Sequence, residues 1–235
     1  MIAVLVPAHD EEQAIGACLQ SLVLAAACPR LQGEDVRVFV ALDRCRDRTA
    51  AVCASFGVHC LPLAEGNVGI ARATAARAAI AAGARWLACT DADSQVSPDW
   101  LSAQLAYDCD AFCGIVTVAD WSGWPPALRQ AYLAGECHRD GHRHVHGANL
   151  GLSTELYLRC GGFLPLPVHE DVALVAAMER VHARIARRCR PVVTTSARRV
   201  ARARGGFSDY LLQMEQAVLQ GALPLAGAAG GAVSP

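Results

Sequence analysis

The sequence contains no lysine, so arginine supplies all 21 of its basic residues. Nine of these arginines fall within residues 180–204, a stretch without any acidic residue, and the net charge of -1 therefore hides a basic C-terminal third. The planar guanidinium group suits phosphate oxygens because its N–H groups donate in pairs. Nucleic acid could use the same stretch, but it lacks the interleaved aromatic residues on which bases stack. We expect a phosphate-bearing ligand and no nucleic-acid partner.

Long apolar runs are missing as well. Hydrophobic residues make up 53% of the chain, but no run reaches the roughly 18 residues that a membrane span requires. The N-terminus carries no basic region ahead of its apolar stretch, unlike a secretory signal peptide. We expect a cytoplasmic protein and leave peripheral membrane contact open.

Motifs that define several other protein classes are also absent. The 11 cysteines are scattered and include no Cys-x-x-Cys pair, which favours buried reduced thiols over disulfides or a zinc site. The Gly-x-Gly-x-x-Gly fingerprint does not follow the first apolar run, which disfavours a dinucleotide-binding dehydrogenase. Residues 7–16 lack the glycine-rich loop ending in Lys or Arg that is usual in nucleotidyltransferases, so that class is the weaker alternative.

The most informative motif that is present reads TDADS and covers residues 90–94, directly after the apolar residues 86–89. Two carboxylates that lie two residues apart at the end of a strand, Asp91 and Asp93, can meet one divalent cation with oxygen ligands. A cation held there could stabilise a diphosphate as a leaving group. On this motif alone, a simple turn or a helix cap before Pro98 is an equal alternative.

Acidic residues follow two further apolar runs in the same way. The run at the N-terminus leads into Asp10 and Glu11, and the run over residues 36–42 ends at Asp43. Open α/β sheets bind ligands at the carboxyl ends of their strands. Three acidic strand ends therefore predict one shared site.

Apolar periodicity alternates between short strands and helices along the chain. The expected helices cover residues 11–27, 47–56, 68–82, 99–107, 127–137, 154–160, 170–181 and 207–219, and the expected strands cover 2–6, 36–42, 58–61, 86–90, 111–118 and 191–195. Asn67 is the expected N-cap of the third helix. This alternation predicts a single-domain α/β fold with a doubly wound, mainly parallel sheet.

Four histidines fall within residues 138–146. Such a tract is compatible with a metal site, but its glycine and arginines are more typical of a polar loop. The sequence leaves both interpretations open.

With these motifs in this order, the chain resembles the family-2 glycosyltransferases, nucleotide-sugar-dependent enzymes with the GT-A fold. The resemblance covers roughly residues 1–205 and is carried by VPAHDEE at 6–12, LDRCRDRTA at 42–50, GNVGIARATAARAAI at 66–80, WLACTDADSQVSPDWL at 86–101, GANLGLSTELYLRCGGF at 147–163 and HEDVAL at 169–174.

The sequence also departs from the family pattern. Asp10-Glu11 stands where Asn-Glu is usual, and Leu42-Asp43-Arg44-Cys45 stands where Asp-Asp-Gly-Ser is usual. The Gln-x-x-Arg-Trp motif of processive polysaccharide synthases is absent, which favours transfer of a single sugar.

The resemblance implies roles for individual residues. Asp171 of the Glu170-Asp171 pair would be the catalytic base, although two acids at a helix N-terminus also suit the helix dipole. Asp93 would bind Mg²⁺ or Mn²⁺ directly, and Asp91 would contact the ribose or the metal through water. The implied nucleotide-sugar site comprises Pro7, Ala8, Asp10, Glu11, Asp43, Asn67, Arg72, Asp91, Ala92, Asp93, Arg198 and Arg199, and the implied acceptor site comprises Gly147, Ala148 and Asn149.

Three of these assignments are specific. Asp43 resembles the residue that accepts a hydrogen bond from the base ring. The other two come from position in the sequence: Arg72, one helical turn from Val68, could reach a phosphate, and Arg198-Arg199, which follow the hydroxyl residues 194–196, could clamp the diphosphate or an acidic acceptor.

The expected protein is thus an inverting, metal-dependent, hexosyltransferase-like enzyme. Residues 1–118 would bind the nucleotide sugar and 119–205 the acceptor, followed by a C-terminal helix at 206–220 and a flexible tail at 221–235. The altered segments around Asp10 and Asp43 make a non-catalytic nucleotide-sugar-binding protein the main alternative.

Overall fold

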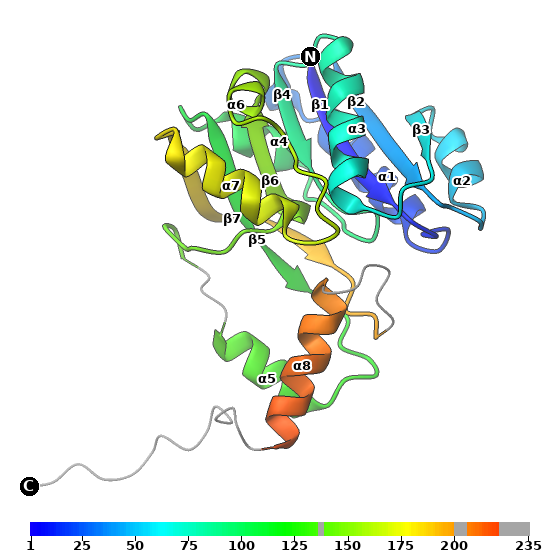
Figure 1. The fold of residues 1–235 in the computed structure, drawn as a ribbon, viewed down its shortest axis with the longest axis vertical. Coiled ribbons are helices and arrows are strands. Elements are labelled where there is room, and N and C mark those ends of the chain that lie inside the picture. Colours follow the sequence, from blue (N-terminus) through cyan, green and yellow to red (C-terminus); the bar gives the residue numbers. More distant parts are fainter. Residues whose placement is uncertain (136–138, 200–205, 221–235) are drawn as a thin grey trace, which may run out of the picture.

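The computed structural model describes residues 1–135, 139–199 and 206–220. Within them, seven strands form one sheet in the order β3-β2-β1-β4-β6-β5-β7, with helices on both faces (Figure 1). β6 runs antiparallel to its neighbours β4 and β5, and the other neighbouring strands are parallel. The strands are β1 (Ile2–Ala8), β2 (Val36–Asp43), β3 (His59–Leu63), β4 (Trp86–Cys89), β5 (Ala111–Val118), β6 (Leu150–Ser153) and β7 (Ile185–Thr195). The predicted doubly wound α/β fold is confirmed.

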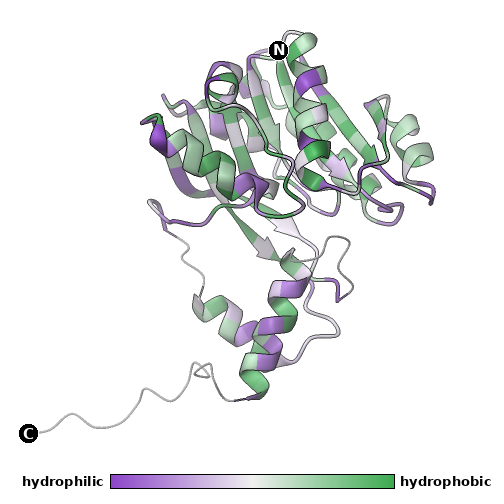
Figure 2. Cartoon of the chain, viewed as in Figure 1, coloured by the Kyte–Doolittle hydropathy of each residue, from purple (hydrophilic) through white to green (hydrophobic). Residues whose placement is uncertain are grey.

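Side chains alternate between the two faces of a strand, and β1 shows how this divides the core. Ile2, Val4 and Val6 join one hydrophobic cluster, whereas Ala3 and Leu5 join the other. The first cluster is covered by α1 (Ile15–Ala26), α2 (Thr49–Ser55) and α4 (Trp100–Leu105), and the second by α3 (Val68–Ala81), α6 (Thr154–Arg159) and α7 (Glu170–Arg180). Figure 2 shows the apolar (green) central strands between these two layers.

Helix α3 begins where the sequence predicts, because the Asn67 side chain accepts a hydrogen bond from the Ile70 N–H at 3.1 Å. Its buried face consists largely of alanine, which allows the helix to lie close to the sheet. Arg72 belongs to this same helix and is only 2% exposed. The helix therefore delivers a buried positive charge to the strands beside it.

Three elements differ from the sequence-based expectation. α1 starts at Ile15 rather than at residue 11, because the preceding residues form a turn in which the Glu11 carbonyl accepts the Ile15 N–H at 2.9 Å. β7 already begins at Ile185, so part of the arginine-rich run is strand. β6 has no predicted counterpart, since it has only four residues and directly follows one turn of 3-10 helix.

Two helices, α5 (Pro126–Gly135) and α8 (Phe207–Leu219), pack against each other away from the sheet, and we call this pair the α5–α8 module. Its small core consists of Val118, Trp124, Leu128, Tyr132, Ala197 and Leu211. In Figure 1 the module lies beyond the edge of the sheet at which the arrows of β1 and β5 end. It therefore flanks the edge where sheets of this kind bind ligands.

No helix among the described residues is both long and apolar enough to cross a membrane. The ten cysteines in the same part of the chain are free thiols, of which Cys18, Cys53, Cys89 and Cys113 are buried. The tail expected over residues 221–235 lies outside the described residues.

Candidate active site

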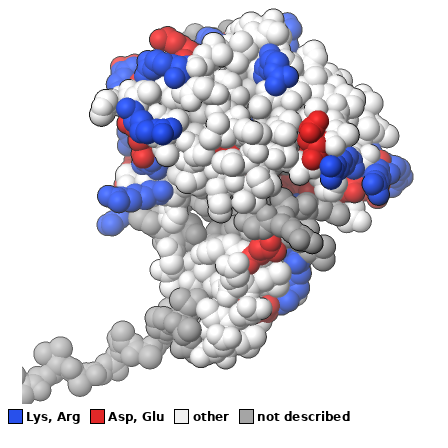
Figure 3. All heavy atoms as spheres, viewed as in Figure 1, with Lys and Arg blue, Asp and Glu red and all other residues white. Residues whose placement is uncertain are grey.

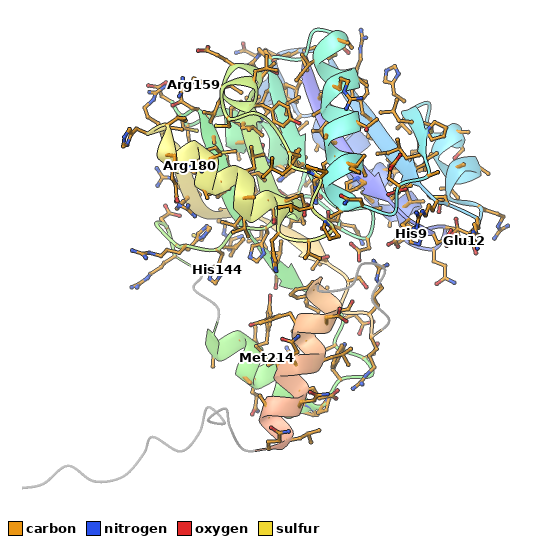
Figure 4. All side chains as sticks on the ribbon, in the orientation of Figure 1. His9, Glu12, His144, Arg159, Arg180 and Met214 are labelled. Atoms are coloured by element: carbon orange, nitrogen blue, oxygen red, sulfur yellow. The ribbon has the colours of Figure 1, made fainter. Side chains whose placement is uncertain are left out.

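Carboxylates gather at the carboxyl ends of three strands, as the sequence predicts. Glu11 follows β1, Asp43 ends β2, and Asp91 and Asp93 follow β4. In Figure 4 the label His9 marks the end of β1 at this edge. Glu11 and Asp43 are only 6% and 5% exposed. A buried charge is unfavourable unless it is paired or hydrogen-bonded, and two arginines and several backbone N–H groups provide this pairing.

The first arginine, Arg72, lies between Asp91 and Glu170, and we call these three residues the Arg72 cluster. Its Nε donates to Glu170 Oε1 at 2.9 Å, and its Nη2 donates to Asp91 Oδ1 at 2.5 Å. The Arg72 and Glu170 side chains are 3% and 6% exposed, whereas Asp91 is 39% exposed. Burial raises the pKa of Glu170, and the Arg72 charge opposes this shift. The cluster joins α3 to α7 and to the end of β4.

Asp171 lies beside the Arg72 cluster, at the N-terminus of α7. Its Oδ2 accepts the Gly147 N–H at 2.6 Å, and its Oδ1 accepts the Val172 N–H at 2.8 Å. A Cβ on Gly147 would lie 2.6 Å from Arg72 Nη2 and 3.3 Å from Asp171 Oδ2, so a larger residue has no room there. The Asp171 carboxylate is thus held in one orientation by two backbone N–H groups.

The second arginine, Arg198, lies beyond the end of β7, and together with Glu11 and Asp93 it forms the Arg198 cluster. Its Nη1 donates to Glu11 Oε2 at 2.7 Å, and its Nη2 lies 3.1 Å from Asp93 Oδ2. Burial raises the pKa of Asp93 to about 6, although the Arg198 charge acts in the opposite direction. The Arg198 side chain is 28% exposed, so this arginine is more accessible to water than Arg72.

Asp43 shapes the loop before α3. Its Oδ1 accepts the N–H groups of Glu65 and Gly66 at 2.8 and 2.9 Å, and its Oδ2 accepts the Asn67 N–H at 2.8 Å. Both carboxylate oxygens are therefore engaged by the backbone. The hydrogen bond to a base ring that the resemblance implies for Asp43 stays a prediction.

Asp91 and Asp93 fit a divalent cation that is shared with a bound diphosphate. Among the described residues, no three His, Cys, Asp or Glu side chains are grouped so that they could hold a metal by themselves. Mg²⁺, however, is commonly held by one or two carboxylates together with substrate phosphates, and Mn²⁺ accepts the same oxygen ligands. The buried Thr90 hydroxyl at the same strand end has no hydrogen-bond partner in the described part of the chain, which leaves one more oxygen there without a bond.

A family model described as Glycosyl transferase family 2 matches residues 3–157, more than half of the chain. The chain belongs to this family. The family 2 match includes Asp91 and Asp93 and ends before Asp171 and Arg198, so the roles of the latter two depend on the geometry above. No curated protein matches the chain by sequence.

Solved structures show that the chain has the GT-A fold. S. aureus TarS (residues 1–349) in complex with UDP-GlcNAc aligns with a TM-score of 0.65 and 16% identity, covering 91% of this chain and 65% of that one. M. tuberculosis glucosyl-3-phosphoglycerate synthase in complex with Mn²⁺, UDP and phosphoglyceric acid aligns with a TM-score of 0.57 and 18% identity, covering 97% and 80%. In another structure of TarS 1–349 the chain spans 60% of that protein's length, with 83% of this chain covered, a TM-score of 0.63 and 16% identity.

Of the three residues expected to bind the acceptor, the structure brings only Gly147 to the site. Ala148 is 5% exposed and belongs to the core, and Asn149 is fully buried. The Asn149 amide donates to two backbone carbonyls at 2.8 and 2.9 Å and accepts from the Trp100 indole at 2.9 Å. Because its hydrogen-bonding groups are used inside the core, we reassign Asn149 to the scaffold.

Arg199 faces away from the carboxylates although it directly follows Arg198. Its Nε donates to the Gly123 carbonyl at 2.7 Å, its Nη2 donates to Glu215 at 2.5 Å, and its guanidinium lies 4.3 Å from the centre of the Trp124 ring. Arg199 therefore ties the chain to the α5–α8 module. Of the two arginines expected to form a clamp, only Arg198 faces the carboxylates.

The arginine-rich C-terminal third carries less free charge than its sequence indicates. Its described ion pairs are Arg184 with Asp108 and Asp110, Arg187 with Glu179, Arg188 with Asp140, Arg198 with Glu11 and Asp93, and Arg199 with Glu215. On the face shown in Figure 3, arginines (blue) lie toward the sides, several of them next to acidic residues (red). Arg202 and Arg204 lie outside the described residues.

The other residues expected to bind the nucleotide sugar lie at strand ends and in the loops beside them. Pro7 and Ala8 form the end of β1, and Ala92 separates the two aspartates; Ala8 and Ala92 are 4% and 3% exposed. Asp10 accepts the Arg46 N–H at 2.7 Å, which fixes the loop after β2. Arg72, which the sequence analysis expected to contact a phosphate, instead forms ion pairs with the two carboxylates of the Arg72 cluster.

The described histidines of the tract lie in a row, in which the His144 and His146 rings are stacked and the His142 ring is tilted against that of His144. The rings of His142 and His144 lie 5.6 Å apart, and those of His144 and His146 lie 5.7 Å apart (His144 is labelled in Figure 4). Burial lowers the pKa of His146 to about 4, so this ring is neutral near pH 7. A metal ion needs nitrogens that converge on one point, and the described histidines do not do so. His138 lies outside the described residues.

Two contacts of the site had no signal in the sequence. Arg72 and Glu170 are 98 residues apart, and Gly147 and Asp171 are 24 residues apart, so no local spacing connects either pair. The only hint in the sequence is that the alanine-rich helix α3 carries two arginines, of which Arg72 is buried and Arg77 is exposed.

Proposed function

We propose that this chain is an inverting glycosyltransferase that moves a single sugar from a nucleoside diphosphate sugar to an acceptor. The observation that carries the proposal is the placement of Asp171. Its carboxylate is fixed by the Gly147 N–H and adjoins the Arg72 cluster, which reaches the TDADS motif through Asp91. A base and a donor-side carboxylate therefore belong to one connected group.

Asp171 would accept the proton of the attacking acceptor group. General-base assistance of this kind contributes about 10²–10⁴ in rate. Arg72 acts through its neighbours, because it neutralises Glu170 and keeps a positive charge beside Asp171. Glu170 is 5% exposed and bound to Arg72, so we assign it a positioning role rather than contact with the acceptor.

We further propose that Asp93, assisted by Asp91, holds Mg²⁺ or Mn²⁺. Such an ion, when bound, neutralises the negative charge that develops on the departing nucleoside diphosphate. The complexes of TarS with UDP-GlcNAc and of glucosyl-3-phosphoglycerate synthase with Mn²⁺ and UDP support uridine nucleotides as the first donors to test.

We also propose, as the sequence predicts, that residues 1–118 bind the nucleotide-sugar donor and residues 119–205 bind the acceptor. The packing of α8 against α5 supports adding this last helix to the acceptor half. One residue of that half, Arg198, reaches back to donor-side carboxylates.

A non-catalytic nucleotide-sugar-binding protein is the second candidate. It is favoured by one observation, the departure of the segments around Asp10 and Asp43 from the family pattern. Incubation with UDP-, GDP-, ADP- and dTDP-sugars and Mn²⁺, with nucleoside diphosphate release and thermal shift measured together, separates the two. The glycosyltransferase proposal expects release with at least one donor and its loss in Asp171→Asn. A thermal shift without release from any donor, in the presence of a broad set of acceptors, would favour the binding protein.

A further inference from the structure

Arg198 supplies a positive charge where two buried carboxylates meet. Its guanidinium contacts Glu11 at 2.7 Å and Asp93 at 3.1 Å, and these two side chains are only 7% and 12% exposed. Without Arg198, two acids drawn from different strand ends would face each other with little access to water, which is unfavourable. The arginine therefore neutralises a carboxylate, Asp93, that a divalent cation is also suited to neutralise.

The main chain around Arg198 is held from both sides. The Ala197 carbonyl accepts a hydrogen bond from the Trp124 indole, and Arg199 is bonded to Gly123 and Glu215. The Arg198 side chain, in contrast, is 28% exposed, whereas that of Arg72 is 3% exposed. The side chain can therefore turn toward solvent while its main chain stays in place.

From this geometry we propose that Arg198 is an exchangeable counter-ion. In the ligand-free protein it neutralises Glu11 and Asp93, and it turns from Asp93 to the diphosphate when nucleotide and divalent cation enter together. This proposal rests on the proposed function and assigns to Arg198 the coupling between the two ligands.

The exchange has an asymmetric consequence. A divalent cation that arrives alone would deprive Arg198 of its contact with Asp93 and give it no new anionic partner. A cation that arrives with a nucleoside diphosphate provides phosphate oxygens, which the guanidinium binds well. Nucleotide should therefore strengthen cation binding, and the cation should strengthen nucleotide binding by the same factor.

The test is Mn²⁺ binding in the absence of nucleotide, measured by the electron paramagnetic resonance signal of free Mn²⁺. Arg198→Gln removes the competing charge, so we expect it to bind Mn²⁺ alone roughly tenfold more tightly than the wild type, the factor that corresponds to about one charge-assisted contact. The same variant should bind UDP in the presence of Mn²⁺ more weakly, because the diphosphate has lost its arginine. Arg199→Gln removes the neighbouring charge and should leave Mn²⁺ binding unchanged.

A second variant covers the event that Arg198→Gln does not fold. Arg198→Lys keeps the charge but replaces the fork with a single point donor, so it cannot make both contacts equally well and should also bind Mn²⁺ alone more tightly than the wild type. Mn²⁺ binding that is equal or weaker in both variants, or raised as much in Arg199→Gln, would overturn the exchange. If that happens while the wild type binds UDP with Mn²⁺, the proposed function stands. If the wild type binds neither UDP nor GDP, it is the proposed function that fails.

Discussion

Two arginine–carboxylate clusters lie at the same edge of one sheet, and they differ mainly in how deeply the arginine is buried. Arg72 comes from the middle of a helix, is 3% exposed and has a buried Nη1 without a hydrogen-bond partner among the described residues. Arg198 comes from the segment after a strand and is 28% exposed. The same pairing of one arginine with two carboxylates thus provides a fixed support in one place and a replaceable charge in the other.

Burial distinguishes the two arginines because it determines the free-energy cost of losing an ion-pair partner. Breaking a buried ion pair leaves an uncompensated charge and costs about 3–5 kcal/mol, whereas an exposed pair is worth only about 0–1 kcal/mol. The Arg72 cluster should therefore resist change, and the Arg198 cluster should respond to ligands.

The largest effect should come from the residue that the Arg72 cluster supports. Asp171→Asn keeps the size of the side chain and its contacts with backbone N–H groups on one oxygen but cannot accept the acceptor proton. We expect turnover to fall by about 10²–10⁴, with nucleotide affinity nearly unchanged. Stability should fall modestly, because the amide nitrogen replaces one oxygen that accepts a backbone N–H. Kinetics, calorimetry and thermal unfolding check this. Glu170→Gln is the matched comparison and should lower stability more than turnover; unchanged turnover in Asp171→Asn would reject Asp171 as the base.

The next effect compares the two arginines directly. Arg72→Gln leaves buried Glu170 without its ion pair and should lower the free energy of unfolding by about 3–5 kcal/mol. Arg198→Gln should lower it by less, because the Arg198 side chain is itself 28% exposed and a partly exposed ion pair is worth less than a buried one. Urea unfolding followed by circular dichroism measures both. Equal losses in the two variants would contradict the distinction between a fixed and a replaceable charge.

A smaller loss of stability is expected from a substitution at Gly147, which lies against the Arg72 side chain. The new Cβ of Gly147→Ala would lie 2.6 Å from Arg72 Nη2, so we expect a loss of about 1–3 kcal/mol through overpacking together with reduced turnover. Gly135→Ala is the control, because a Cβ there meets nothing within 4 Å. Equal stability of the two variants would show that the contact at Gly147 has no energetic weight.

The smallest effect concerns Arg199. Its pair with Glu215 joins an arginine that is 44% exposed to a carboxylate that is 15% exposed, so Arg199→Gln should lower stability by about 1 kcal/mol, the upper end for exposed pairs. Because the residue faces the α5–α8 module, the Michaelis constant for the donor should stay the same. A marked rise of that constant would restore Arg199 to the phosphate site.

The fold could be predicted because its signals are local. Apolar runs, the Asn67 cap and the regular alternation of elements are all visible within short windows of sequence. Strand β6 could not be predicted, because its four residues are too few to show an alternation of apolar and polar side chains. The acidic strand ends were predictable because parallel strands place their carboxyl ends together.

The contacts within the site could not be predicted from residue types. Arg198 and Arg199 are chemically identical neighbours, and only the packing of Arg199 on Trp124 decides which of them faces the carboxylates. Asn149 lies in a motif of the acceptor region, yet its side chain satisfies core carbonyls. Which way a side chain faces is set by distant elements, such as α8 in the first case and β5 and β7 in the second.

The most direct test of the central claim is calorimetric titration of UDP and GDP into the wild-type protein, once with Mn²⁺ and once with EDTA. The account predicts that at least one nucleotide binds about tenfold or more tightly with Mn²⁺, a difference of at least ~1.4 kcal/mol, and that Asp93→Asn removes the difference. Equal affinity with Mn²⁺ and with EDTA in the wild type would contradict it, because Asp91 and Asp93 would then not hold a cation for the diphosphate.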